Sequence, residues 1–144
     1  MTSVDRADPI VEQFELSQSD FDAFADLSGD ANPIHIDPDF AADTVFGATV
    51  SHGMLLFSRL RGALERHYPG CRLIGQELVF RHPAYADSPL RLVLTPRAVP
   101  PGEPLLTLGA EIIRDDGQPC LEGDCRLVRQ RLASPVQTGE EVRS

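Results

Sequence analysis

The order of apolar and polar positions predicts helices in the first half of the chain. Apolar residues alternate over "IVEQFEL" (residues 10–16), which is typical of a first strand. In "SQSDFDAFADLSG" (residues 17–29) they recur at helical spacing behind a serine cap, and Gly29 is a natural helix end. "DPDFAAD" (residues 37–43) has an aspartate cap followed by proline, which predicts a second short helix.

The longest predicted helix lies within "SHGMLLFSRLRGALERHYPG" (residues 51–70), where Pro69-Gly70 ends the pattern. Three- and four-residue spacing gives it one apolar stripe. The stripe comprises Met54, Phe57, Leu60, Leu64 and His67, widened by Leu56 and Ala63. We expect this helix to be central and buried.

After residue 70 the apolar period shortens to that of strands. "LIGQELVF", "LRLVLT", "PLLTLGAEII" and "CLEGDCRLV" predict four strands, and Asp116-Gly117 marks a turn between the last two. We expect an antiparallel meander. Helices grouped before strands indicate an α+β fold.

The size of the chain suits one domain, because 144 residues can bury a core of their own. We place this domain at residues 10–131, with an N-terminal tail at 1–9 and a polar, flexible tail at 132–144. No apolar run is long enough for a membrane helix, and the N-terminus lacks a signal core. The three cysteines lack a CxxC spacing and indicate reduced thiols, so we expect a cytoplasmic protein.

The net charge of -9 argues against nucleic-acid binding. This charge is unevenly distributed: residues 1–47 carry 11 acids and one arginine, whereas residues 48–97 carry seven arginines and three acids. Guanidinium groups suit phosphates, so the central block is a candidate contact for a phosphorylated ligand or an acidic carrier. A solvated surface is the alternative for any single arginine.

The stretch "LSGDANPIHIDPDF" contains the first candidate chemistry. Pro33 interrupts a helix and favours extended geometry at Asn32, so we expect a loop in which Asp30 and His35 converge. A carboxylate beside a neutral imidazole can hold a water molecule and take its proton. The alternative is a turn or cap at Asp30 with a packed His35. Asn32 either forms the turn or braces the loop.

A second candidate is His52-Gly53, at the start of the long helix. Free amides and the helix dipole favour negative charge there, so the Gly53 N–H is a candidate donor to a carbonyl oxygen that gains charge. The alternatives are a helix-start glycine and a histidine that fixes the turn. His35 and Asp37 have no third partner at metal-ligand spacing, so no metal site is expected.

Taken together, "FADLSGDANPIHIDPDFAADTVFG" and "SHGMLLFSRL" resemble the motif of the MaoC-like (R)-specific enoyl-CoA hydratases. That pattern is S-G-D-x-N-P-x-H-x-D, then F-A, F-G and H-G-M. The resemblance covers about residues 10–130. It implies a hot-dog fold, in which an antiparallel sheet wraps the long helix, and water addition to a trans-2-enoyl thioester or the reverse dehydration. Asp30 and His35 would be the catalytic pair and Gly53 the oxyanion donor, without metal or redox cofactor.

The resemblance leaves several alternatives open. Arg61 stands where such hydratases often have a serine, which implies a changed pocket or tunnel opening, or merely a surface arginine. A hot-dog thioesterase, or a partner subunit of a heteromeric dehydratase, would keep the fold and change the activity. The thioester carrier is either CoA or an acyl carrier protein. We expect a homodimer, with a higher oligomer or a heteromeric partner as alternatives.

Overall fold

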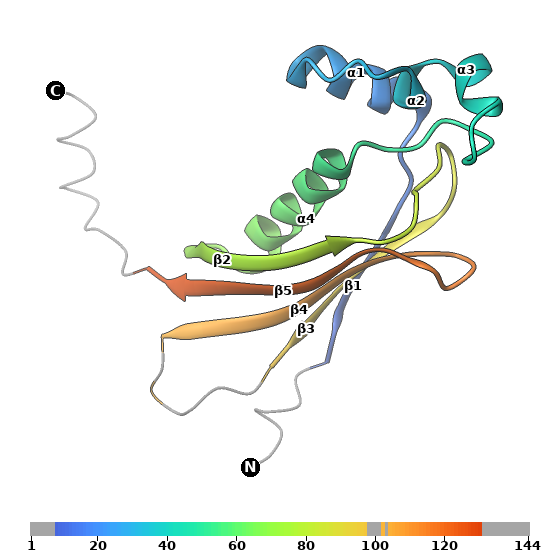
Figure 1. Ribbon diagram of the computed structural model, residues 1–144. Helices are drawn as coiled ribbons and strands as arrows, with labels where there is room; N and C mark the ends of the chain where they lie inside the picture. Colours follow the sequence, from blue (N-terminus) through green and yellow to red (C-terminus); the bar gives the residue numbers. More distant parts are fainter. Residues whose placement is uncertain (1–7, 98–101, 103, 131–144) are drawn as a thin grey trace, which may run out of the picture.

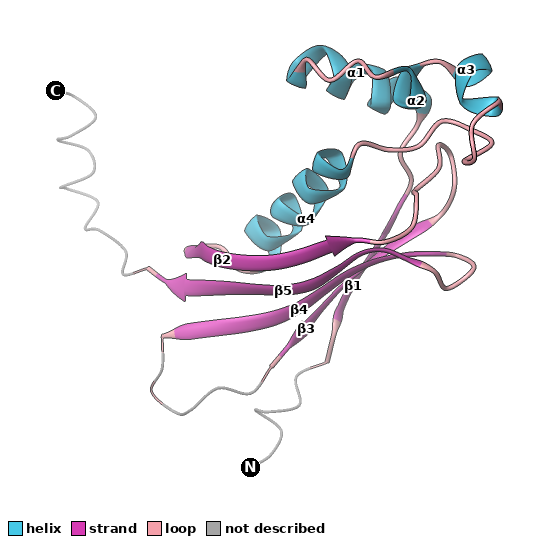
Figure 2. Cartoon of the chain, in the orientation of Figure 1, coloured by secondary structure: helices cyan, strands magenta, loops and turns pink. Residues whose placement is uncertain are grey.

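The computed structural model describes residues 8–97, 102 and 104–130. This part of the chain has four helices and five strands (Figures 1 and 2), and all but the short helix at Pro33–Ile36 follow the predicted order. They are β1 Ile10–Phe14, α1 Gln18–Ser28, α2 Pro33–Ile36, α3 Pro38–Ala42, α4 Gly53–His67, β2 Cys71–Phe80, β3 Leu90–Pro96, β4 Leu105–Arg114 and β5 Pro119–Arg129. The predicted tails lie outside the described residues, except for Asp8 and Pro9. Within the described part, no helix combines the length and apolar character needed to cross a membrane.

The strands form one antiparallel sheet in the order β1-β3-β4-β5-β2. The expected meander holds for β3, β4 and β5. It is wrong for β2, which pairs with β5 instead of β3 and so lies at an edge (Figure 1). Alternation along a strand shows which side chains share a face, but it does not show which strand is the neighbour.

The long helix α4 lies across one face of the curved sheet (Figure 1). Its buried residues are Leu56, Leu60, Ala63 and Leu64. They join a core that includes Phe14, Leu92, Leu94, Leu108, Ala110, Ile112, Leu121, Cys125 and Leu127. Fully burying one such leucine contributes about 1.5–3 kcal/mol. Met54 and His67 were expected in the buried stripe but are exposed, because they stand at the two helix ends, beyond the contact with the sheet.

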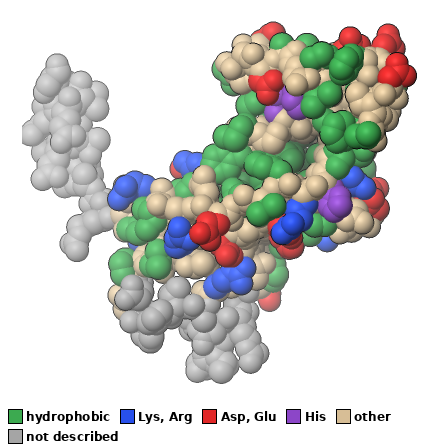
Figure 3. Space-filling model, viewed as in Figure 1, with side chains coloured by type: hydrophobic (Ala, Val, Ile, Leu, Met, Phe, Trp, Pro, Cys, Tyr) green, Lys and Arg blue, Asp and Glu red, His purple; other side chains and the backbone are tan. Residues whose placement is uncertain are grey.

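The helices α1, α2 and α3 form a separate layer beyond the N-terminal end of α4 (Figure 1). A capping box starts α1: the Ser17 hydroxyl accepts from the Asp20 N–H, and the Asp20 carboxylate accepts from the Ser17 N–H. Gly29 ends α1 at a φ of 83°, a conformation that favours glycine. In Figure 3, histidine side chains are visible between this layer and the rest of the molecule.

The segment after Gly29 differs from the loop expected there. Asn32 has extended geometry, as predicted, but its side-chain oxygen accepts from the Ile34 N–H at 3.1 Å and caps α2. Pro33 therefore begins a four-residue helix, and His35 lies within that helix. Proline is tolerated at the first helical position because its missing N–H would have no partner there.

An ionic cluster joins α4 to the edge strand β1. Arg66 donates two hydrogen bonds to the Glu12 carboxylate, at 2.6 and 3.1 Å, and His67 Nε2 lies 2.7 Å from the same group. The Arg66 hydrogen bond is the main reason that the pKa of Glu12 falls from 4.5 to about 2; burial opposes this shift and the His67 hydrogen bond adds to it. The cluster therefore stabilises the fold while Glu12 is ionised.

We predict that Glu12→Gln lowers the free energy of unfolding at about pH 7 by about 1 kcal/mol. The folded pKa lies below the unfolded one, so the contribution is present above 4.5 and lost as the pH falls toward about 2. The difference between wild type and variant, measured by urea unfolding, should therefore shrink at about pH 3. An equal difference at both pH values would contradict the role assigned to the cluster.

Candidate active site

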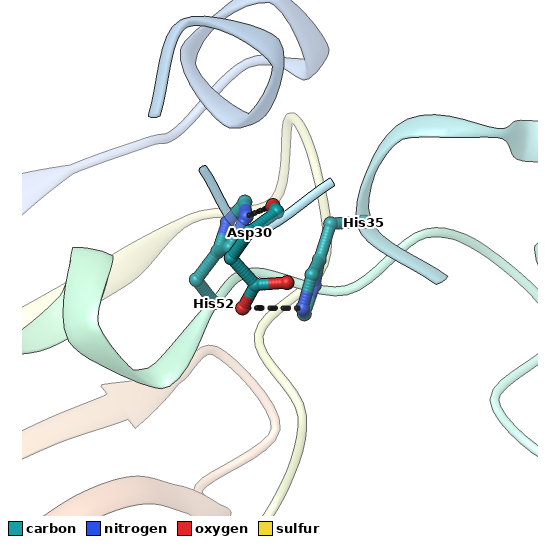
Figure 4. Close-up of side chains that lie close together, drawn as sticks. All are labelled: Asp30, His35 and His52. Atoms are coloured by element: carbon teal, nitrogen blue, oxygen red, sulfur yellow. Dashed lines mark hydrogen bonds and ion pairs between the residues drawn. The ribbon is translucent and has the colours of Figure 1, made fainter. Parts of the chain in front are cut away.

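Asp30 lies in the short connection between α1 and α2, and its two carboxylate oxygens have different neighbours. Oδ1 accepts from the Asn32 N–H at 3.3 Å, which is the expected turn role. Oδ2 lies 3.8 Å from Nε2 of His35 (Figure 4). The side chain is 56% exposed, so solvent reaches it. The turn role and a chemical role are therefore compatible, because each uses a different oxygen.

His35 is held in one protonation pattern by the backbone. Its Nδ1 lies 2.8 Å from the carbonyl oxygen of Val50, which can only accept, so Nδ1 carries the proton. Nε2 then has a free lone pair in the neutral ring, and it faces Asp30. The 3.8 Å gap is too long for a direct hydrogen bond. A water molecule that contacts both groups is the natural bridge across such a gap.

Two residues that the sequence analysis missed hold His35 in place. The Gln18 amide nitrogen donates to the His35 backbone carbonyl at 2.8 Å, and the Gln18 amide oxygen accepts from the Thr49 hydroxyl at 2.6 Å. These bonds tie α1 to α2 and to the segment before α4. Thr49 stands just before the S-H-G stretch, but no pattern in the sequence singles out Gln18.

His52 contacts both members of the pair. Its Nε2 donates to the Asp30 backbone carbonyl at 2.9 Å. Its ring stacks on that of His35, with centroids 3.8 Å apart and planes at 24°. Figure 4 shows the three residues converging from separate segments. The side chain is buried, so His52 supports the pair from within the protein.

A pocket of about 290 Å³ opens beside His35. Its walls are formed by Ile34, His35, Phe46, Val50, Ser51, Gly53, Leu56, Phe80, Arg81, His82, Pro83, Ala84 and Cys120. Gly53 is the first residue of α4, and the His52 side chain does not cap this helix. A Cβ on Gly53 would lie 3.2 Å from the Phe80 ring. The glycine thus leaves room beside an amide at the positive end of a helix.

Four sequence candidates are not part of the pocket wall: Asp30, Asn32, His52 and Arg61. Asp30 lies beside the wall, 3.8 Å from His35. The hydrogen bonds of Asn32 and His52 go to the backbone, as described above, and a substrate contact of either residue stays a prediction. Arg61 lies eight residues beyond Gly53, about 12 Å along the helix axis. Its guanidinium pairs with Glu65 at 3.8 Å. Within the described chain, Arg61 is therefore a surface residue.

Among the described residues, one group of side chains comes close enough to be considered as metal ligands. It consists of Asp30, His35 and His52, with one atom from each and all three atoms within 4.8 Å of one another. In each histidine, one ring nitrogen is hydrogen-bonded to a backbone carbonyl. The rings are stacked, so the lone pairs on the other two nitrogens, Nε2 of His35 and Nδ1 of His52, lie in separate planes. This arrangement is poorly suited to sharing one tetrahedral ion.

Burial raises the pKa of the Cys120 thiol to about 11, so the cysteine in the pocket wall is not a ready nucleophile.

This chain is similar to known proteins in sequence and in structure. The family described as the MaoC like domain matches residues 4–98 of this chain. The chain belongs to the MaoC-like domain family. An (R)-specific enoyl-CoA hydratase from Aeromonas caviae is 38% identical over 104 residues, which cover 71% of this chain and 78% of that protein.

Two further comparisons concern a solved structure and a plant dehydratase. A solved structure of an (R)-hydratase from A. caviae matches this MaoC-like chain with a TM-score of 0.80 and 30% identity, covering 89% of this chain and 98% of the other. The chain therefore has the hot-dog fold that the resemblance implied. A mitochondrial 3-hydroxyacyl-[acyl-carrier-protein] dehydratase from Arabidopsis thaliana is 38% identical over 87 residues, 60% of this chain and 52% of that protein.

Proposed function

We propose that this protein is a hydro-lyase that adds water to a trans-2-enoyl thioester, or removes it from the corresponding 3-hydroxyacyl thioester. One observation carries the proposal: His35, whose Nε2 faces the Asp30 carboxylate, and Gly53, at the helix terminus, line the same pocket. An enoyl thioester needs a base for water near C3 and a donor for its carbonyl oxygen. The named relatives support this class of reaction.

In the hydration direction, the Asp30 carboxylate accepts a hydrogen bond from the water and Nε2 of His35 takes one proton from it. The water oxygen bonds to C3, and the C2–C3 double-bond electrons move into an enolate. The Gly53 N–H stabilises the oxygen that gains charge. His35, now protonated and near the Asp30 carboxylate, returns the proton to C2. The product has gained one OH and one H, and the enzyme is unchanged.

The carrier of the acyl group is a phosphate-bearing thiol, either CoA or an acyl carrier protein. Arg81 and His82 are exposed residues of the pocket wall and come from the arginine-rich middle of the chain. The interior of the pocket is apolar at Leu56, Ala84 and Phe80, which suits a hydrocarbon chain. The assays below use both carriers. A cytoplasmic location stays a prediction.

Two copies of the chain pair through β2. Within the described part of the chain this strand has a neighbour, β5, on one side only. It exposes Ile74, Val79 and Phe80 by 47%, 45% and 48%. An exposed apolar edge strand is a template for pairing with another strand. Because Phe80 also lines the pocket, a second chain at this edge would help to close the pocket.

We predict a dimer by light scattering, and a monomer for Ile74→Lys, because a charge at the edge opposes strand pairing. Val45→Lys is the matched control, since Val45 is 96% exposed and lies outside β2. A monomeric wild type at micromolar concentration would contradict the pairing. So would a dimer that both lysine variants leave intact.

The reaction itself is tested by following the absorbance of crotonyl-CoA and of a longer enoyl thioester, on CoA and on a carrier protein, beside a free-thiol assay. Loss of the enoyl signal without thiol release is expected. Asp30→Asn and His35→Gln should each lower kcat by about 10²–10⁴-fold, because each removes one member of the acid–base pair. Circular dichroism should show the wild-type fold. Thiol release by the wild type would instead make the protein a thioesterase.

We predict that Gly53→Pro lowers kcat by about 10²–10³-fold, because it removes the N–H proposed to bind the enolate oxygen. Proline suits this first helical position, and the φ of -59° and ψ of 142° at His52 suit a residue before proline. Gly53→Ala is the matched control, since it adds a Cβ near Phe80 and keeps the N–H. Equal losses in both variants would assign the effect to crowding.

A further inference from the structure

We propose that His52 is a positioning residue that fixes the Asp30–His35 pair relative to the Gly53 amide. This inference rests on the proposed function, and its test includes a measurement that needs no substrate. Three contacts carry it: one to the backbone of Asp30, one to the ring of His35, and the covalent bond to Gly53.

The first contact is the 2.9 Å hydrogen bond from His52 Nε2 to the Asp30 carbonyl. This bond places the proton on Nε2 and leaves a lone pair on Nδ1. Among the described residues, Nδ1 is buried and has no hydrogen-bond partner. Burying an unpaired polar atom opposes folding, so an apolar ring of similar shape would be the more stable choice. The contribution of the histidine is therefore the Nε2–H, which donates to the Asp30 carbonyl and which an apolar ring lacks.

The second contact is the stack on His35, with ring centroids 3.8 Å apart. Phe24 meets the His52 ring edge-on at 4.9 Å, so the ring is itself held in place. The bond to Val50 fixes only one nitrogen of His35, and rotation about that bond remains possible. A flat neighbour against the face of the imidazole removes this freedom and keeps Nε2 directed at Asp30.

The third contact is the chain itself. His52 is the residue before α4, so its carbonyl carbon is bonded to the Gly53 nitrogen that carries the proposed oxyanion donor. One side chain thus joins the acid–base pair to the amide that must act on the same substrate. A displacement of about 1 Å in such an arrangement can lower a rate by about 10²-fold.

Three variants separate these contacts. His52→Gln keeps a donor near the position of Nε2 and loses the ring; His52→Phe keeps a ring and loses the donor; His52→Ala loses both. We expect kcat to fall by about 10–10²-fold in the alanine variant, with smaller losses in the other two. The value of kcat/KM should fall in proportion, because the lost alignment acts on the transition state. All assays use crotonyl-CoA and the full chain.

Leu92→Ala is the stability control, because Leu92 is fully buried in β3 and does not line the pocket. It should lower Tm at least as much as His52→Ala while kcat stays within about threefold of wild type. Nitrogen-15 NMR of the imidazole groups gives the substrate-free measurement. The His35 ring should give one sharp set of signals in the wild type and in His52→Phe. In His52→Ala these signals should be broadened or doubled, because the ring is then free to rotate about its hydrogen bond to Val50.

The inference is overturned if kcat in all three His52 variants stays within about threefold of wild type. It is also overturned if Leu92→Ala loses kcat in parallel with Tm, or if the His35 ring signals are as sharp and single in His52→Ala as in the wild type. A wild type that hydrates none of the thioesters defeats the proposed function, and the NMR signals of the His35 ring alone then decide the role of His52.

Discussion

The packing of α4 on the inner face of the sheet is the constraint on which the rest of the structure depends. It buries Leu60 and Leu64 completely or almost so, against the strands β3, β4 and β5. Once the middle of the helix is fixed by this contact, its first residue has a defined place at one end of the sheet. The amide of Gly53 is therefore positioned by apolar burial several residues away. Polar contacts near the site need only orient the side chains there.

The orientation of these side chains is set mainly by hydrogen bonds to backbone carbonyls. His35 donates to the carbonyl of Val50 and His52 donates to that of Asp30. Each bond selects a tautomer without adding a charge beside the ring. As a result, His35 presents a lone pair toward the only carboxylate in the cluster. Gln18 adds a third backbone contact, from α1 to the carbonyl of His35. The layer of short helices is thus held as one unit above the start of α4.

The segment from Gly29 to His35 must also fold, and its polar residues serve both the folding of the chain and the proposed chemistry. Asp30 uses one oxygen in a turn with Asn32 and turns the other toward His35. Asn32 caps α2 and so orients the helix that carries His35. Capping requires short polar side chains at fixed positions, and the proposed chemistry requires an acid and an imidazole in contact. The order of residues in "GDANPIH" satisfies both requirements within seven positions.

The sequence by itself determined the helices and strands other than α2, because caps, prolines and apolar periods act over a few residues. Ser17, Gly29 and Asp37 mark helix ends where the structure has them, and the motif around Asp30, His35 and Gly53 indicated the family. Only the tertiary structure decided that β2 pairs with β5, that Arg61 lies away from the pocket, and that His52 stacks on His35. The β2–β5 pairing and the stack of His52 on His35 join residues 17 to 58 positions apart, and local patterns carry no information about which distant surface a side chain will meet.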